Sequence, residues 1–312
     1  MLAIKAENLT RTFGPLTAIQ RLNLTVERGE IFGLVGPDGA GKTTIIRMFT
    51  GILRPTEGDA WVLGHHIAQD AESLKDQIGY MSQRFGLYGD LTVIENIHFY
   101  ADLYDVPSKE RPQRIERLLS FSNLAPFKSR LAQNLSGGMK QKLGLACALV
   151  HTPKILFLDE PTNGVDPVSR RDFWRILYDL LKEGVTIFVS TAYLDEAERC
   201  YRIGLIHQGT LLSVGTPGEI KALLRGELWE VRCDQRMKAM EMLRNLPWMK
   251  GGGIFGDKIH ILLEGGEAAR MKMENSLNSS GFTIHSLRRI SPSLEDVFIT
   301  TMEDQGQKKS KE

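Results

Sequence analysis

The chain has 312 residues, a formal net charge of +1 at pH 7, and charged residues at 25% of its length. This length accommodates one large and one smaller domain, each able to bury a core. The balanced charge excludes a global field that would recruit nucleic acid or an anionic membrane. The longest apolar stretches, such as Leu143 to Val150, are far shorter than the ~20 residues that cross a bilayer, so a membrane role requires a partner.

The cysteines and the first residues bear on the cellular compartment. Cys147, Cys200 and Cys233 form no C-x-x-C pattern, which argues against a disulfide framework and against a zinc site. A reducing, intracellular compartment fits best. Residues 1–8 alternate like a first strand and contain no apolar segment typical of a signal peptide, so we expect a chain that is not addressed for secretion.

The first elements are short strands that lead into a glycine-rich turn. We expect strands over Leu2 to Glu7 and Ala18 to Val26, with a break at Gly14-Pro15. Phe13 precedes this break and could stack on an adenine ring, although the residue alone favours a place in the core. Gln83 ends a strand predicted over Ile78 to Ser82, where a glutamine is ordinarily a solvated polar group.

A strand from Ile31, a glycine-rich turn and a helix from Lys42 fit the P-loop pattern G-x-x-x-x-G-K-[ST]. Glycines permit backbone conformations that let successive N–H groups surround an anion, and the helix adds the positive end of its dipole. We expect Lys42 to reach the β- and γ-phosphates of a nucleotide and Thr43 to ligate Mg²⁺. The residues assigned to nucleotide binding are Gly36, Asp38, Gly39, Ala40, Gly41, Lys42, Thr43 and Thr44.

From residue 90 to residue 130 the pattern changes to helical apolar spacing. Helices are expected over Leu91 to Tyr104 and Ile115 to Phe121, which indicates a helical insert that serves packing or presents a surface to a partner. Ser136 then suits a helix N-cap before Gly137 and Gly138, with the helix running through Val150. Paired glycines at a helix start form a second anion-binding concavity. Two facing copies of the domain could place each such turn over the other's γ-phosphate.

A continuous apolar strand ends in two carboxylates, Asp159 and Glu160. Such a strand is typical of a parallel sheet, where ligands bind beyond the carboxyl ends of the strands. We expect Asp159 to hold the Mg²⁺ shell and Glu160 to orient and deprotonate an attacking water. The elements predicted next are a helix over Ser169 to Lys182, a strand over Val185 to Ser190, a helix over Tyr193 to Arg199, and a hairpin of Ile203 to His207 with Thr210 to Val214.

From Leu228 the pattern changes to that of a second, smaller domain. Its elements follow the order βαββαβ, which suggests a small α+β domain of ferredoxin-like type, with a short helix over Leu294 to Met302 behind it. Regulation, dimer contact and plain stability are all open roles for this domain. The polar segment 303–312 could be a free tail or the start of a linker.

These motifs occur in the order and spacing of the ABC ATPases, and the resemblance covers residues 2 to about 220. It implies an α/β fold of P-loop NTPase type, with a nucleotide-binding domain over 1–222, an inserted helical lobe over about 88–150 and a C-terminal domain over 223–302. ATP and Mg²⁺ are the implied cofactors. The motifs that carry the resemblance are Gly36 to Thr43, Gln83, Leu135 to Gln141, Ile155 to Glu160 and Gly164 to Pro167.

The resemblance assigns roles to residues that carry little signal alone. By this likeness Phe13 is the adenine-stacking aromatic, and Gln83 links Mg²⁺ to the helical lobe and has a part in catalysis. Asp166 belongs to the loop that crosses a dimer interface. The signature turn acts in trans, and its nucleotide-binding residues are Ser136, Gly137, Gly138 and Gln141.

Within the family, the stretches Gln83 to Tyr88 and Pro292 to Phe298 resemble exporter ATPases. These power membrane-spanning permease subunits that move drugs, polysaccharides or lipids outward, and they act in the cytoplasm at the inner face of the membrane. The second nucleotide-binding domain would be an identical chain, a different chain or a missing second half. A soluble ABC ATPase acting on ribosomes or DNA is the alternative, but the sequence has no coiled-coil insert and no large basic arm, so we expect no nucleic-acid partner.

One position departs from the family pattern. The family places a histidine after Ser190-Thr191, where it contacts the γ-phosphate, whereas this chain has Ala192. A methyl group neither donates a hydrogen bond nor carries charge. We therefore expect slowed hydrolysis with ATP binding intact, by the ~10²–10³-fold typical of losing one positioned polar group. A hydrolysis-impaired regulatory ATPase is the corresponding alternative.

Overall fold

The computed structural model describes residues 1–83, 86–244, 246 and 248–309. The chain divides into two compact units, Met1–Leu211 and Leu212–Glu312, whereas the sequence placed the domain boundary at 222/223. Each unit is described by itself. Within the described ranges, no helix combines the length and the apolar character that crossing a bilayer requires.

An antiparallel sheet of order β2-β1-β4-β5 forms one layer of the first unit. Its strands are β1 (Leu2–Phe13), β2 (Leu16–Glu27), β4 (Glu57–Val62) and β5 (His65–His66). The prediction that the first strand ends at Glu7 is wrong. Asn8 has a φ of 49° and the register shifts between Ala6 and Leu9, so the alternation of side chains is interrupted while strand pairing continues to Phe13.

A second sheet, of order β10-β9-β3-β8-β7-β6, carries the buried apolar strands. The strands of this sheet are β3 (Ile31–Val35), β6 (Ile78–Met81), β7 (Ile155–Asp159), β8 (Thr186–Thr191), β9 (Arg202–His207) and the less buried β10 (Thr210–Gly215). All residues of β3, β7 and β8 are buried, and these strands pair in parallel. Helix α1 (Lys42–Phe49) packs Phe49 against Phe157 and Phe188 of the sheet. The parallel arrangement predicted from the continuous apolar strands is confirmed.

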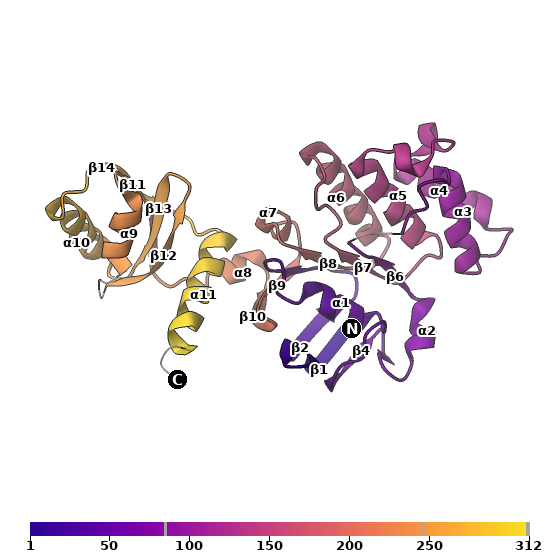
Figure 1. Cartoon of the computed structure of the whole chain (residues 1–312), viewed down its shortest axis with the longest axis horizontal. Helices are drawn as coiled ribbons and strands as arrows, with labels where there is room; N and C mark the ends of the chain where they lie inside the picture. The colour runs from indigo at the N-terminus through magenta and orange to yellow at the C-terminus, as the bar shows by residue number, and fades with distance from the viewer. Residues whose placement is uncertain (84–85, 245, 247, 310–312) are drawn as a thin grey trace. The chain divides into compact units, whose positions relative to one another are not determined.

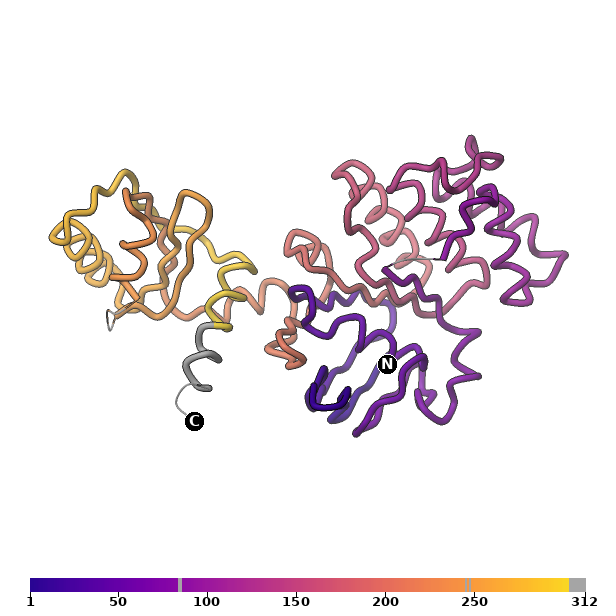
Figure 2. The backbone as a smooth tube through the Cα atoms, viewed as in Figure 1, coloured from indigo at the N-terminus to yellow at the C-terminus, as the bar shows by residue number. Residues whose placement is uncertain are grey.

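The helical insert predicted between β6 and β7 is also present, and Figures 1 and 2 show its helices grouped to one side of the strands. It contains α3 (Val93–Leu103), α4 (Arg111–Phe121), the 3-10 turns Ala125–Phe127 and Ala132–Asn134, and α5 (Gly137–Leu149). A capping box between Thr92 and Glu95 begins α3, and the Ser136 hydroxyl accepts from Met139 N at the start of α5 as predicted. A further helix, α2 (Ala71–Lys75), precedes β6 and was not predicted.

Helix α6 (Pro167–Lys182) begins before the predicted Ser169 because Asp166 caps it. The Asp166 carboxylate accepts from the backbone N of Ser169 at 2.9 Å, and hydrogen bonding from Ser169 lowers the pKa of Asp166. Gly184, with a φ of 88°, follows the Glu183 C-cap at the position where glycine commonly ends a helix. Helix α7 (Leu194–Ala197) is shorter than the predicted segment Tyr193 to Arg199.

The second unit contains the predicted βαββαβ order. It comprises α8 (Pro217–Lys221), β11 (Glu227–Cys233), α9 (Arg236–Arg244), β12 (Met249–Phe255), β13 (Lys258–Leu263), α10 (Gly266–Ser279), β14 (Ile284–Ile290) and α11 (Leu294–Lys309). The sheet order is β12-β13-β11-β14, and each neighbouring pair is antiparallel. Its apolar core includes Val231, Met240, Ile259 and Met273. Helix α11 runs beyond the predicted end at Met302, into the segment predicted as a polar tail.

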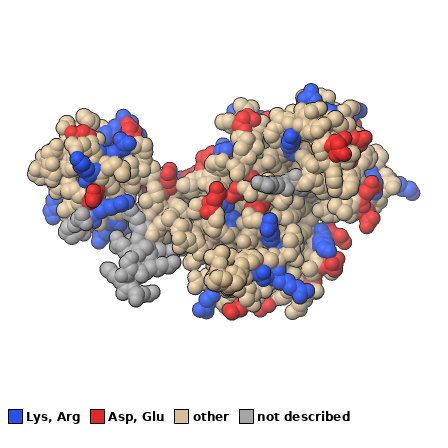
Figure 3. Space-filling view, viewed as in Figure 1, with Lys and Arg blue, Asp and Glu red and all other residues tan. Residues whose placement is uncertain are grey.

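A cluster of charges lies beside the core of the second unit. The Glu230 carboxylate is 5% exposed and pairs with Lys258 and Arg288, each at 2.8 Å. Hydrogen bonds from Arg288 and Lys258 lower the pKa of Glu230 to about 2. On the face that Figure 3 shows, basic and acidic side chains are interspersed over both units, which agrees with the balanced net charge.

Candidate nucleotide site

An open pocket of about 710 Å³ lies at the P-loop and gathers side chains from distant parts of the first unit. The predicted site residues that line this pocket come from β1, the P-loop, α1, and the segments that follow β6 and β7. Because β3, β6 and β7 belong to one parallel sheet, their carboxyl ends share an edge. The lining residues are Phe13, Leu16, Thr17, Ala18, Asp38, Gly39, Gly41, Lys42, Thr43, Thr44, Gln83, Glu160 and Gln208.

The P-loop backbone requires glycine at two positions for steric reasons. A Cβ on Gly36 would stand 2.2 Å from the carbonyl oxygen of Ile206, and one on Gly41 would stand 2.4 Å from Ile19 Cδ1. Gly41 also has a φ of 104°, which favours glycine. Ala40 is buried, whereas the side chain of Asp38 is 90% exposed. The loop therefore approaches the sheet closely on one side and opens toward the pocket on the other.

Lys42 connects the P-loop to Glu160, the residue directly after β7. Its ammonium group is 4% exposed and donates to the carbonyl oxygens of Gly36 at 2.7 Å and Pro37 at 3.0 Å. It also lies 2.9 Å from Glu160 Oε1. A buried cation needs this many partners to offset its lost hydration. The lysine is thus held at the pocket with its charge facing a carboxylate, where a phosphate oxygen could take the place of that carboxylate.

Glu160 is held from several directions. Its Oε2 accepts from Gln83 Nε2 at 2.9 Å and from Asn163 Nδ2 at 3.3 Å. Its backbone has a φ of 48°, a left-handed conformation that costs a non-glycine residue roughly 1 kcal/mol or more. Lys42, Glu160 and Gln83 therefore form one connected chain of side chains along the pocket.

Asp159 and Ser190 are buried next to Glu160. Asp159 is 1% exposed; its Oδ1 accepts from the Ser190 hydroxyl at 2.7 Å, whereas its Oδ2 is buried without a hydrogen-bond partner among the described residues. The same hydroxyl accepts from the backbone N of Glu160 at 3.0 Å. Ser190 thus fixes both acidic residues through one oxygen atom.

The donor set fits Mg²⁺ that is shared with phosphate oxygens. The unpartnered carboxylate oxygen of Asp159 and the Thr43 hydroxyl are hard oxygen ligands of the kind that Mg²⁺ prefers. In the described part of the chain, no cluster of three or more histidine, cysteine, aspartate or glutamate side chains could hold a metal alone. Mg²⁺ usually binds through one or two carboxylates together with substrate phosphates, so this sparse set suits it.

Phe13 lies at the end of β1, where its side chain is 43% exposed, and not in the core. The Arg11 guanidinium stacks over its ring at 4.5 Å. Leu16, Thr17 and Ala18 follow on the returning strand and line the same pocket. An exposed ring at the edge of a phosphate site can stack on a base.

The predicted signature residues lie outside this pocket. Ser136 and Gly137 are exposed, and Gly138 is buried against Ser169, where a Cβ would come within 2.5 Å of that side chain. Gln141 and Gln83 instead line a separate pocket together with Gln133 and Lys140. The structure therefore does not bring the signature turn to the chain's own P-loop. Residues 84 and 85 of the predicted exporter stretch lie outside the described residues.

Ala192 lies exposed directly after β8 and lines a smaller pocket with Asp38, Glu160, Asn163 and Tyr193. The neighbouring backbone is fixed by the buried Glu196 carboxylate, which accepts from Thr191 Oγ1 at 2.7 Å and from Thr162. The methyl group of Ala192 thus faces the same region as Glu160 but offers it no polar atom.

Several pocket residues were missed by sequence reasoning. Ser190 and Asn163 contact the two acidic residues, and Gln208 approaches from the turn after β9. A serine inside an apolar strand was the available signal for Ser190, because a buried hydroxyl needs a partner. Leu16 to Ala18 could have been found from the hairpin, which returns the chain beside Phe13.

Comparison with known proteins agrees with this geometry. Residues 19–163 match the model of the ABC transporter family. The chain is 41% identical over 295 residues to the probable multidrug ABC transporter ATP-binding protein YbhF of Escherichia coli (strain K12), covering 94% of this chain but 50% of that protein. It is 35% identical over 245 residues to the daunorubicin/doxorubicin resistance ATP-binding protein DrrA of Streptomyces peucetius, covering 78% of this chain and 74% of that protein.

The chain therefore spans about half the length of the first of these curated relatives. Among solved structures, cbiO1 from Clostridium perfringens, part of the ABC transporter complex cbiONQ, aligns with a TM-score of 0.66 and 26% identity. That alignment covers 79% of this chain and 96% of cbiO1. The P-loop geometry, the coverage of DrrA and this structural likeness lead to one conclusion: the chain belongs to the ATP-binding proteins of the ABC transporter family.

Proposed function

We propose that this chain binds and hydrolyses ATP to power export of a substrate through separate membrane-spanning subunits. The observation that carries the proposal is the connected chain Lys42, Glu160 and Gln83 beside the P-loop. It places a phosphate-binding cation, a carboxylate and an amide in one pocket. The names of two relatives support an export role, because one refers to a probable multidrug ABC transporter and the other to daunorubicin/doxorubicin resistance.

Each residue has a distinct part in the proposed reaction. Lys42 binds the β- and γ-phosphates, and Phe13 stacks on the adenine ring. Glu160 orients the attacking water and accepts its proton, while Gln83 holds the second oxygen of the Glu160 carboxylate. Thr43, Gln83 and Asp159 would hold Mg²⁺, which neutralises the charge that develops on the phosphates.

A second nucleotide-binding domain completes the site. The signature turn Ser136 to Gly138 lies outside the chain's own P-loop pocket. Ser136 and Gly137 are exposed at the start of α5, where an anion can reach them. We infer that this turn contacts the γ-phosphate held by a partner domain. ATP then favours the closed pair because it contacts both domains only in that state. The permease subunits and the inner face of the membrane are the proposed setting.

A direct test uses Glu160→Gln in the full chain. This substitution preserves the side-chain volume but removes the general base, so ATP and Mg²⁺ should produce a long-lived dimer that light scattering detects. Hydrolysis should fall by ~10²-fold or more, within the range of general-base catalysis. Lys42→Ala should abolish both dimer formation and hydrolysis. A Glu160→Gln protein that binds ATP, stays monomeric and hydrolyses at the original rate would overturn the proposal.

The alanine at position 192 forms a separate part of the proposal. Because Ala192 lines the small pocket beside Glu160 without a polar atom, we propose slow cleavage with intact binding. Ala192→His should raise the single-turnover rate of ATP cleavage by ~10²–10³-fold and leave nucleotide affinity nearly unchanged. An unchanged rate would show that this site does not need the histidine.

A further inference from the structure

A cavity of about 360 Å³ lies at the opposite end of the strands that carry Asp159 and Ser190. We call it the amino-end pocket; it is lined among others by Arg28, Leu118, Leu149, Lys154, Leu180 and Thr186. Lys154 precedes β7 and Thr186 begins β8. At about 3.3 Å per residue, Asp159 lies roughly 13 Å along β7 from its first residue. The amino-end pocket shares no lining residue with the P-loop pocket.

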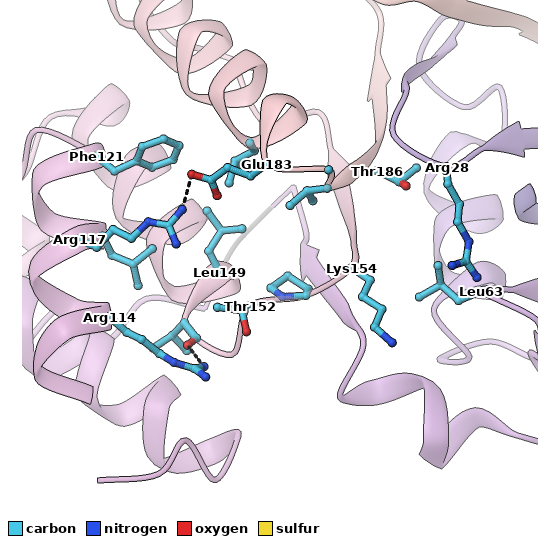
Figure 4. A pocket seen from close by; sticks show the side chains of 16 residues that line it. Arg28, Leu63, Arg114, Arg117, Phe121, Leu149, Thr152, Lys154, Glu183 and Thr186 are labelled. Carbon is cyan, nitrogen blue, oxygen red and sulfur yellow. Dashed lines mark hydrogen bonds and ion pairs between the residues drawn. The ribbon is translucent and has the colours of Figure 1, made fainter. Parts of the chain in front are cut away.

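The interior of the amino-end pocket is apolar and is built by two parts of the first unit. Leu118 and Leu149 come from α4 and α5 of the helical insert, whereas Leu180 comes from α6. Phe121 adds an aromatic ring on the α4 side, as Figure 4 shows. An apolar cavity of this size is within the range that holds a small organic ligand.

The rim of the pocket is basic. Arg28, Arg114, Arg117 and Lys154 line it, and Glu183 is the one acidic residue among the described lining residues. Figure 4 shows Arg114 and Arg117 on one side, and Lys154 and Arg28 on the other. The rim therefore carries a net positive charge, which favours an anionic ligand.

The two sides differ in how far their charges are already compensated. Arg117 pairs with Glu183, and Arg114 donates to the Val150 carbonyl oxygen at 3.1 Å and pairs with Glu110. Lys154 Nζ donates to the neutral Gln77 Oε1 at 2.9 Å and has no acidic partner among the residues that the structure describes. The Arg28 guanidinium makes neither an ion pair nor a hydrogen bond within the described part of the chain. Lys154 and Arg28 are therefore the cations available to a ligand.

We propose that the amino-end pocket binds a small amphipathic anion. Its apolar body, the size of one or two rings, occupies the space between Leu149 and Leu180. Its sulfonate, phosphate or carboxylate group lies at Lys154 and Arg28, where charge-assisted hydrogen bonds are the strong ones. Both features are needed, because the apolar walls alone do not select an anion and the exposed cations alone bind one weakly. This inference does not depend on the proposed ATPase function.

Calorimetric titration of the full chain with 2-naphthalenesulfonate tests the proposal. Two further probes separate the contributions: the neutral 2-naphthalenesulfonamide keeps the rings, and inorganic sulfate keeps the charge. We expect saturable binding of the sulfonate, at least about tenfold weaker binding of the sulfonamide, and no measurable binding of sulfate. The double variant Arg28→Ala/Lys154→Ala should weaken sulfonate binding by roughly tenfold or more for each cation removed.

The matched control is Arg175→Ala, which removes a cation whose side chain is 70% exposed and which lies outside the pocket lining. It should leave the affinity unchanged. Titration in the presence of saturating ATP excludes the P-loop pocket, where an aromatic anion could also bind. Displacement of the sulfonate by ATP would overturn the proposal. So would equal affinity for the sulfonamide, or full affinity in the double variant with its circular dichroism spectrum unchanged.

Discussion

Ser190→Ala tests the role of the buried hydroxyl beneath the two acidic residues. Ser190 is fully buried, donates to Asp159 Oδ1 at 2.7 Å and accepts from Glu160 N at 3.0 Å. Alanine would leave both oxygens of Asp159 without a hydrogen-bond partner among the described residues. The Glu160 N–H would keep the carbonyl oxygen of residue 190, at 3.2 Å. The expected loss of stability therefore comes mainly from the buried Asp159 carboxylate, which loses its hydrogen bond.

A hydrogen bond to a charged group contributes about 1.5–3 kcal/mol, so we expect the unfolding free energy of the first unit to fall by about 2 kcal/mol. For a unit of this size the midpoint of thermal unfolding should fall by roughly 4–8 °C. Differential scanning calorimetry measures this directly. ATP turnover in Mg²⁺ should also fall about 10- to 100-fold, as is typical when a residue that orients a metal ligand is lost.

The matched control is Ser120→Ala, because Ser120 is exposed on α4 and the substitution slightly favours a helix. It should leave stability and turnover within experimental error. An unfolding free energy of Ser190→Ala within about 0.5 kcal/mol of that of the original chain, a change no larger than that of an ordinary surface substitution, would show that this hydroxyl does not stabilise the buried carboxylate. Unchanged turnover would show that the hydroxyl does not position Asp159 or Glu160.

Three further outcomes follow from local contacts. Gly36→Ala should destabilise the first unit by about 1–3 kcal/mol in urea unfolding, because the added Cβ would meet the backbone carbonyl oxygen of Ile206. At Gly218 an added Cβ would meet no atom within 4 Å, so Gly218→Ala should change the unfolding free energy little. Thr92→Ala should cost about 0.5–2 kcal/mol in the same assay by removing a capping box, and an unchanged midpoint would contradict that role. The folded pKa of Glu230, about 2, lies below its ordinary value of 4.5, so its contribution to stability is complete above pH 4.5 and is lost as pH falls toward 2. Acid unfolding followed by tryptophan fluorescence should lose this dependence in Glu230→Gln, measured in a chain in which Trp61 and Trp174 of the first unit are replaced by Phe so that the signal reports the second unit.

The P-loop turn and its helix were predictable because their residues are contiguous. Gly36 to Thr43 bring their own turn, cation and helix N-terminus, so local conformation suffices to form the anion-binding concavity. The same holds for the capped start of α5 at Ser136, where one side chain meets the backbone three residues later. The strongly apolar strands were also predictable, since β7 and β8 are buried along their whole length.

Element boundaries were less predictable where backbone hydrogen bonds extend beyond the residues that follow the apolar pattern. β1 continues past Glu7 because strand pairing persists through an irregular register at Asn8. Helix α6 begins before Ser169 because the Asp166 carboxylate supplies a cap that apolar spacing does not reveal. In both cases hydrogen bonding to backbone groups, and not the apolar pattern, decides where the element begins or ends.

Contiguous motifs and local patterns sufficed to predict the P-loop turn, the family of the chain and the βαββαβ order of its second unit. The packing of the sheet brings Gln83 to Glu160 across 77 residues of sequence and places Ser190 against Asp159 from a neighbouring strand. It also brings Lys154 and Arg28 to one cavity. The physical reason is that a parallel sheet aligns the ends of strands that are distant in sequence, so contacts between their side chains depend on strand order and packing.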